Sequence, residues 1–190
     1  LYGDRVQVIA APPPQLPPNG PKVLGVDAGS TTAKAILLGP ATQGVVASYY
    51  TRTKGDPVAA TRECLRALVE QVGNRCVSLA GSTGSARELA GAYLGTEHVY
   101  NEISAHAAGA AHFDREVDTI FEIGGQDSKY IYLRNGVPID YAMNNACSAG
   151  TGSFLEESAH GDLGIDVSEI ASLALAAPAP VQFKATCAAF

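Results

Sequence analysis

From position 22 onward, the chain alternates short apolar segments with polar, glycine-rich turns. Three segments with strand-like alternation come first, at 23–27, 33–38 and 45–50. The short turns between them are typical of an antiparallel meander. A helical pattern follows, because apolar residues recur at i, i+3, i+4 and i+7 from Leu65 to Val72. We expect this helix to begin near Pro57, behind the cap residue Asp56.

The same pattern then runs through a second cycle. The rest of the first cycle is expected to contain a strand at 76–79 that leads into Gly81–Gly84, a helix at 85–94, a strand at 98–100 and a helix at 103–113. The second cycle has strands at 119–123, 129–133 and 137–143, with the hairpin signal Asn135-Gly136, and a helix at 151–160. Such a repeat predicts an α/β fold of two related lobes with a cleft between them.

The segment before position 22 has a different composition. Six of the eleven prolines lie between 11 and 21, which is typical of an extended linker. A short strand is expected before it, at 6–9, and the absence of an initial Met indicates a segment of a longer protein. We therefore expect a tail and linker at 1–21, a first lobe at 22–117 and the start of a second lobe at 118–190. The second lobe looks unfinished, because the sequence stops just after a candidate strand at 181–184.

Charge and composition narrow the class of protein. A formal net charge of −6 argues against a protein that binds nucleic acid through a cationic face. The sequence has no apolar run of membrane-spanning length and no secretory leader, so we expect a soluble, cytoplasmic protein that does not bind membranes. The four cysteines form no CxxC pair, which makes a zinc ribbon or a secreted disulfide scaffold a poor description.

The first glycine turn carries residue types that bind phosphate. It reads Asp27-Ala28-Gly29-Ser30-Thr31-Thr32-Ala33-Lys34, with predicted strands on both sides. Its amides and hydroxyl groups can converge on a phosphate while Asp27 faces a metal ion. It is not a Walker A loop, because that motif is GxxxxGK[ST] and opens a helix. The alternative is an ordinary Gly-Ser β-turn.

A second turn repeats this formula of acid, glycine, hydroxyl and lysine. It reads Glu122-Ile123-Gly124-Gly125-Gln126-Asp127-Ser128-Lys129. Two such turns predict a clamp in which amides and Lys34 or Lys129 meet phosphoryl oxygens. Asp27 and Asp127 are then available to Mg²⁺, a hard cation that prefers oxygen ligands. Gly81–Gly84 and Asn101-Glu102 are candidates for further ligands or hinge contacts, with helix capping as the alternative.

Cysteine chemistry is expected near the predicted last helix. Cys147 lies just before a glycine-rich helix start, where amides and the helix dipole lower the pKa of a thiol. We expect a reactive or metal-bound thiolate there; a buried apolar cysteine is the alternative. With Cys187 it would supply half of a four-cysteine iron–sulfur set, which a two-fold dimer would complete. We expect Cys64 and Cys76 to be core residues, and the four histidines, which lack HxxxH or HExxH spacing, to be surface or capping residues.

Four segments of the chain are distinctive when taken together: LGVDAGSTTAK (24–34), NEISAHAAGA (101–110), IGGQDSK (123–129) and CSAGTGSF (147–154). In this order they resemble the ATP-dependent activators of 2-hydroxyacyl-CoA dehydratases. That family, with the related benzoyl-CoA reductase ATPase subunits (the BadF/BadG/BcrA/BcrD family), belongs to the actin, sugar-kinase and heat-shock-chaperone ATPase superfamily. The resemblance extends over essentially 22–190 and implies the actin-like (ribonuclease H-like) fold.

The resemblance implies roles for particular residues. It implies ATP and Mg²⁺ between the lobes, with Asp27, Gln126 and Asp127 as catalytic residues. The nucleotide-binding residues would be Gly29, Ser30, Thr31, Thr32, Lys34, Glu102, Gly124 and Gly125. It also implies a homodimer that shares one [4Fe-4S] cluster, held by Cys147 and Cys187 of each subunit. Hydrolysis would change the lobe angle so that the cluster passes an electron from ferredoxin or flavodoxin to the dehydratase or reductase.

Three departures and two other functions stay open at this point. Family members continue past the second cysteine with elements that contact the adenosine, so a chain that ended at Phe190 is expected to bind nucleotide poorly or not at all. The residues around Cys187 are less typical than those around Cys147, and the proline-rich leader with Ser153 resembles long, multidomain activase-type proteins. The alternatives are a sugar or small-metabolite kinase of the same superfamily, with Asp127 as base, and a non-enzymatic assembly module.

Overall fold

The computed structural model of the chain describes residues 22–39, 44–73, 77–144 and 150–180. These residues form two compact units: a larger one of 22–120 with 130–142, and a smaller one of 121–129 with 143–180. The expected strands at 6–9 and 181–184 lie outside the described residues, as do Cys76, Cys147 and Cys187. The expected lobe boundary between 117 and 118 stays a prediction.

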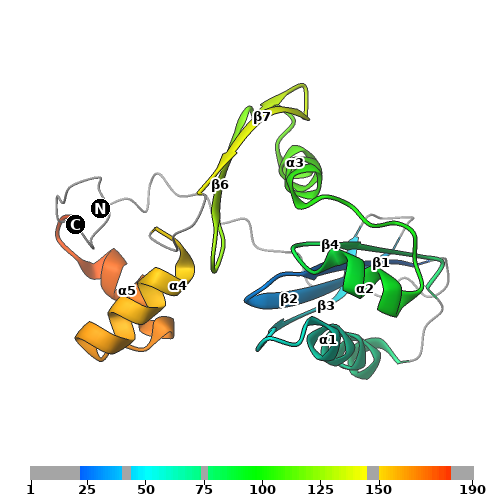
Figure 1. The fold of residues 1–190 in the computed structure, drawn as a ribbon, viewed down its shortest axis with the longest axis horizontal. Coiled ribbons are helices and arrows are strands. Elements are labelled where there is room, and N and C mark those ends of the chain that lie inside the picture. Colours follow the sequence, from blue (N-terminus) through cyan, green and yellow to red (C-terminus); the bar gives the residue numbers. More distant parts are fainter. Residues whose placement is uncertain (1–21, 40–43, 74–76, 145–149, 181–190) are drawn as a thin grey trace. The chain divides into compact units, whose positions relative to one another are not determined.

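The larger unit is built on a four-stranded sheet. Its strands are β1 (Val23–Ala28), β2 (Thr32–Gly39), β3 (Gly44–Arg52) and β4 (Leu79–Thr83), in the order β3-β2-β1-β4. The β1–β2 and β2–β3 pairs are antiparallel, which confirms the expected meander, and β4 joins β1 in parallel. Figure 1 shows this sheet with helices α1 (Pro57–Val72) and α2 (Arg87–Leu94) beside it.

Alternation along β1 gives this sheet its core face. Leu24 and Val26 are buried with Cys64 and Leu68 of α1 and with Ala90 of α2, so both helices cover the same face. The Asp56 carboxylate accepts a hydrogen bond from Ala59 N at the start of α1, as expected for an N-cap. Cys64 is fully buried, which confirms its expected core role, and burial raises the pKa of its thiol.

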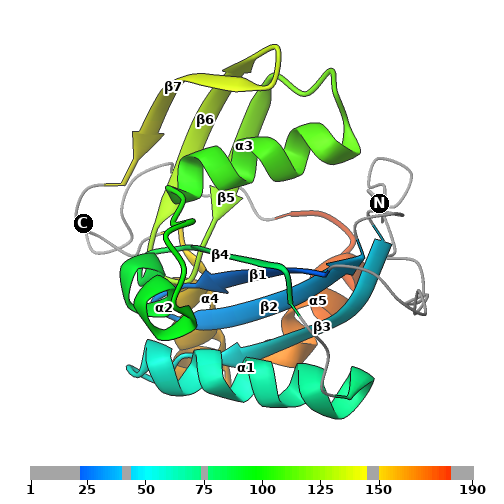
Figure 2. The same ribbon diagram turned by 90° about the vertical axis from the view of Figure 1, so that its right-hand side faces the viewer.

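A second sheet follows helix α3 (Glu102–Phe113). Its strands are β5 (Thr119–Ile123), β6 (Ser128–Arg134) and β7 (Val137–Met143), in the order β5-β6-β7. Asn135 and Gly136 both have positive φ, 53° and 75°, which confirms the hairpin signal. Ala107 of α3 is buried against Ile131 and Leu133 of β6, and Figure 2 shows α3 alongside this strand.

The helices after β7 differ from the expected single helix at 151–160. Helix α4 (Gly152–Glu157) continues as one π-helical stretch, η1 (Ser158–Asp162), and is followed by α5 (Val167–Ala176). Helix α5 was not expected from the sequence, although Asp166 and Glu169 form a capping box at its start. Within the described ranges, no helix has the combination of length and apolar character that a membrane span requires.

Three further elements differ from expectation. Helix α2 begins at Arg87 instead of 85, because its N-cap Ala86 has non-helical backbone angles (φ −103°, ψ 22°); the Ala86 amide donates to the β1 carbonyl of Ala28. The expected strand at 98–100 is a single bridge between Val99 and Ser82, and it cannot continue because Asn101 caps α3. β4 also begins later than expected, at Leu79.

Candidate functional site

The turn between β1 and β2 is a tight hairpin that requires glycine. Gly29 N donates to the carbonyl oxygen of Thr32 at 2.9 Å. A Cβ atom at Gly29 would lie only 2.8 Å from that oxygen, a contact that real side chains do not make. Across the hairpin, Lys34 Nζ lies 2.8 Å from Asp27 Oδ2. The two side chains are 48% and 34% exposed, so this ion pair is open to solvent.

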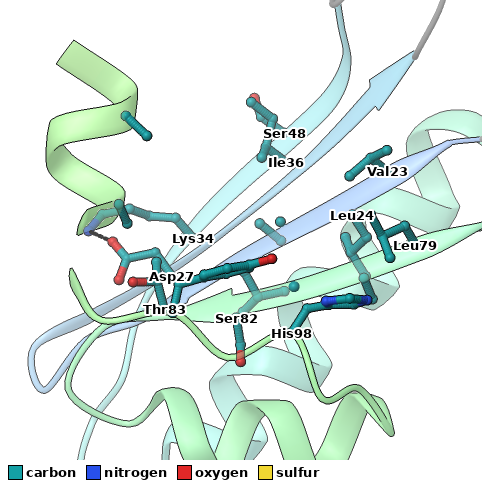
Figure 3. Close-up of a pocket in the computed structure, with 18 of the residues that line it drawn as sticks. Val23, Leu24, Asp27, Lys34, Ile36, Ser48, Leu79, Ser82, Thr83 and His98 are labelled. Carbon is teal, nitrogen blue, oxygen red and sulfur yellow. Dashed lines mark hydrogen bonds and ion pairs between the residues drawn. The ribbon is translucent and has the colours of Figure 1, made fainter. Parts of the chain in front are cut away.

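Three polar residues form a row across the end of the first sheet. Asp27 of β1 is paired in register with Lys34 of β2 on one side and with Thr83 of β4 on the other. The next residue, Gly84, has φ of +92°, and a Cβ atom there would lie 2.5 Å from Asp27 Oδ1. Glycine at this position therefore lets the end of β4 approach the carboxylate. Figure 3 shows Asp27, Lys34 and Thr83 together.

Two buried hydroxyl groups near this row lack a partner within the described residues. They are Thr31 Oγ1 and Thr83 Oγ1, for which the described part of the chain offers no hydrogen bond. Leaving a buried polar group unsatisfied costs about 1–3 kcal/mol. The rest of the turn is braced by Thr53, whose hydroxyl donates to Gly29 O and whose amide donates to Thr31 O. Two orphaned hydroxyl groups, Thr31 in this braced turn and Thr83 at the end of β4, fit a polar ligand such as a phosphate.

A hollow of about 980 Å³ lies over the face of this sheet that α1 does not cover. Asp27, Lys34 and Thr83 line it together with the apolar residues Val23 and Leu79. The α3 residues Ser104, Ala105 and Ala108 also line it. The charged side chains of Asp27 and Lys34 thus lie at one part of the hollow, while most of its wall is apolar (Figure 3).

The β5–β6 turn repeats the first turn in the same register. Gly124 N donates to the carbonyl oxygen of Asp127 at 2.8 Å, as Gly29 N does to Thr32. Lys129 Nζ lies 2.9 Å from Glu122 Oε2, seven residues earlier, as Lys34 pairs with Asp27. The counterpart of Asp27 in the second turn is therefore Glu122, and Asp127 occupies the position of Thr32.

The second lysine has a different environment from the first. Lys129 Nζ also lies 2.9 Å from Asp127 Oδ1, so it bridges two carboxylates. Its side chain is only 4% exposed, whereas those of Glu122 and Asp127 are 19% and 40% exposed. Gln126, at the tip of this turn, is exposed. The two lysines occupy equivalent positions in the sequence pattern, but in the structure they differ in burial and in the number of carboxylates they contact.

The second turn is fastened to the start of α4. Gly152 N donates to Gly124 O at 2.8 Å, and Ser153 N donates to Gly125 O at 2.9 Å. These two amides at the start of α4 are therefore engaged by the second turn, and they link it to the segment that follows the cysteine. The expected reactive or metal-bound thiolate at Cys147 lies outside the described residues and stays a prediction.

Some of the other candidate residues have structural roles in the fold, and the roles of the rest stay predictions. Asn101 caps α3 by accepting from Ile103 N at 2.8 Å, and the Ser82 hydroxyl donates to Arg87 O, so capping and bracing account for both. Glu102 is half-buried in the first turn of α3. His98, stacked on Tyr100, is exposed as expected, as are His112 and His160, while His106 is half-buried.

The structure describes no complete metal site. In the described part of the chain, no three His, Cys, Asp or Glu residues are grouped closely enough to hold a metal ion. Asp27 belongs to the larger unit and Asp127 to the smaller one. Their joint binding of Mg²⁺, like the other site roles taken from the sequence, stays a prediction.

The chain is similar to known proteins of one family. The chain is 35% identical over 171 residues to the (R)-2-hydroxyglutaryl-CoA dehydratase activating ATPase of Acidaminococcus fermentans, covering 88% of this chain and 63% of that protein. It is 30% identical to a component of the benzoyl-CoA reductase of Thauera aromatica, over 86% of this chain and 58% of that protein. The chain thus spans about three fifths of the length of these relatives.

A solved structure confirms the fold. The activator of the 2-hydroxyisocaproyl-CoA dehydratase from Clostridium difficile, solved with bound ADPNP, aligns with a TM-score of 0.75 and 31% identity, over 87% of this chain and 61% of that chain. The expected actin-like ATPase fold is confirmed by this likeness. The profile of the BadF/BadG/BcrA/BcrD ATPase family matches residues 24–190, and this chain belongs to that family.

Proposed function

We propose that this protein hydrolyses ATP and uses it to deliver a low-potential electron to a 2-hydroxyacyl-CoA dehydratase or a related CoA-ester reductase. Family membership and the names of its relatives support the proposal. The observation that carries it is the pair of hairpin turns with one register, the first of which holds the orphaned Thr31 hydroxyl. Turns of this kind bind phosphoryl groups through amides, hydroxyls and lysine.

The residues of the first turn fit a nucleotide phosphate. Gly29, Ser30, Thr31 and Thr32 would contact the phosphates through amides and hydroxyls, and exposed Lys34 would neutralise their charge. In the second turn, Gly124, Gly125 and Gln126 would face the phosphates. Asp27 and Asp127 would hold Mg²⁺, for which carboxylate oxygens are suitable ligands, and Glu102 would contact the nucleotide. Mg²⁺ neutralises charge on the phosphoryl oxygens during transfer.

The redox part of the proposal rests on the cysteine motif. Cys147 and Cys187 of two subunits would supply the four thiolates of a [4Fe-4S] cluster at a dimer axis. Such a cluster supplies one-electron transfer at low potential. The hydrogen bonds from Gly152 and Ser153 to the second turn support a mechanical link between nucleotide and the Cys147 segment. Ferredoxin or flavodoxin would be the electron donor. The protein would act in the cytoplasm. Its two lobes would comprise 22–117 and the residues from 118 onward.

Anaerobic purification of the full-length protein tests this function. We expect about four iron and four sulfide per dimer, a brown colour sensitive to oxygen, and ATP-dependent reduction of a partner dehydratase. The Cys147→Ala variant should lose the cluster. Cys64→Ala is the matched control and should keep it, because Cys64 is buried in the core of the larger unit. Colourless protein with full ATPase activity contradicts the redox role, and a phosphorylated product from a sugar panel would instead support a kinase.

A further inference from the structure

The two hairpins place equivalent lysines in unequal environments. Lys34 and Lys129 both follow a glycine turn by the same spacing, and each pairs with the carboxylate seven residues before it. The Lys34 side chain is 48% exposed, and that of Lys129 is 4% exposed. Equivalent sequence positions therefore do not imply equivalent contacts with a ligand.

Lys34 is able to leave its partner. Its ion pair with Asp27 is exposed on both sides, and exposed pairs contribute little to stability. An incoming phosphate offers more charge and more acceptor oxygens than one carboxylate. Lys34 Nζ can therefore move from Asp27 to a phosphoryl oxygen at small cost, which leaves Asp27 available to other ligands.

Lys129 is held in place. Its ammonium group lies 2.9 Å from Glu122 Oε2 and 2.9 Å from Asp127 Oδ1, and its side chain is buried. Removing a buried charge from its partners is strongly unfavourable, because the remaining charges lose their compensation. Lys129 is thus poorly suited to move toward a phosphate.

The bridge fixes the carboxylate of Asp127. Lys129 Nζ holds Oδ1, and Gly124 leaves room for that oxygen, since a Cβ atom at Gly124 would lie 2.9 Å from it. The Gly124 amide holds the Asp127 carbonyl as well. Asp127 nevertheless remains 40% exposed and so is accessible to a nucleotide-bound cation.

We propose that Lys129 is a positioning residue, anchored by Glu122, that orients Asp127 toward nucleotide-bound Mg²⁺, and that Lys34 is the lysine that contacts phosphate. This inference rests on the proposed ATPase function. Residues that orient a metal ligand typically change metal affinity by about 10–100-fold when they are replaced. The loss should therefore appear in the Mg²⁺ dependence of nucleotide binding.

The test measures ADPNP affinity of the full-length protein by calorimetry, with Mg²⁺ and with EDTA. Three variants are compared with wild type: Lys129→Met, the charge-balanced double variant Glu122→Gln with Lys129→Met, and Lys34→Met. Both variants that lack Lys129 should lose about tenfold or more of the affinity that Mg²⁺ adds. Lys34→Met should weaken binding by a similar factor in both conditions, which leaves the effect of Mg²⁺ unchanged. Thermal unfolding monitored by circular dichroism reports folding of each variant.

The double variant separates positioning from charge balance. If Lys129 only neutralises Glu122, the double variant recovers the wild-type effect of Mg²⁺, and the proposal is wrong. It is also wrong if the double variant does not fold, which shows a structural role, or if Lys34→Met is the variant that loses the Mg²⁺ effect. Wild-type protein that binds no ADPNP overturns the proposed function itself. Wild-type binding with an unchanged Mg²⁺ effect in both Lys129 variants overturns this inference alone.

Discussion

Gly84 is the glycine whose replacement should do most harm to the first turn. It has φ of +92°, and a Cβ atom there would lie 2.5 Å from Asp27 Oδ1 and 2.6 Å from the backbone oxygen of Ala28. Gly95, at the end of α2, also has positive φ, +68°, but a Cβ atom there would meet nothing within 4 Å. The two positions share the backbone strain and differ in the steric overlap.

The two glycines allow the cost of the overlap to be isolated. An L-residue in the left-handed region costs about 1–2 kcal/mol, which is the whole expected effect of Gly95→Ala. Gly84→Ala adds the displacement of a backbone carbonyl and a carboxylate, and forced overlap typically costs a further 1–3 kcal/mol or so. We therefore expect Gly84→Ala to lower the free energy of unfolding by about 2–5 kcal/mol.

Urea unfolding followed by circular dichroism measures both variants, and ADPNP affinity measures the effect on the site. Gly84→Ala should lose affinity because Asp27 is displaced, whereas Gly95→Ala should bind as wild type does. Equal losses of stability in the two variants would refute the reasoning, since they would show that the close approach of Gly84 to Asp27 has no energetic consequence.

Three further predictions follow from single contacts. Thr31→Val should leave the free energy of unfolding unchanged or raise it by about 1 kcal/mol, because it removes an orphaned hydroxyl, while ADPNP affinity falls by about tenfold; loss of stability with unchanged affinity would contradict this. Asp56→Ala should lower the free energy of urea unfolding by about 1 kcal/mol through loss of the hydrogen bond to Ala59 N, and an unchanged midpoint would argue against the cap. Burial raises the pKa of the Cys64 thiol in the folded state above the ordinary pKa of a thiol. The stability that the buried thiol contributes is therefore fully present below the ordinary pKa and is lost as pH rises from there through the folded-state pKa. Reduced wild-type protein should therefore lose more stability than Cys64→Ala between neutral pH and about pH 10, and equal losses would contradict the assignment.

Local patterns in the sequence predict most of the elements. The bounds of α1, β5 and β7 agree with apolar periodicity and turn residues, because these signals are contained within each segment. The start of α2 was expected two residues too early, because the non-helical N-cap Ala86 is fastened to Ala28 O of β1, a contact between residues far apart in sequence. The missed helix α5 had a readable signal, the capping box of Asp166 and Glu169.

For the candidate site as well, some features follow from the sequence and others depend on tertiary structure. Residue types alone indicate two phosphate-binding turns, since glycine, hydroxyl and lysine recur at one spacing. Burial does not follow from spacing, so the sequence could not distinguish Lys34 from Lys129. The orphaned hydroxyl of Thr83 depends on the parallel pairing of β4 with β1, which a sequence pattern does not reveal.

A crystal structure of the full-length protein with ADPNP and Mg²⁺ tests the central claim most directly. The account predicts that the phosphates contact the Gly29–Thr32 turn, with Thr31 Oγ1 and Lys34 Nζ on phosphoryl oxygens. Lys129 should remain between Glu122 and Asp127. A nucleotide bound away from both hairpin turns would contradict the account.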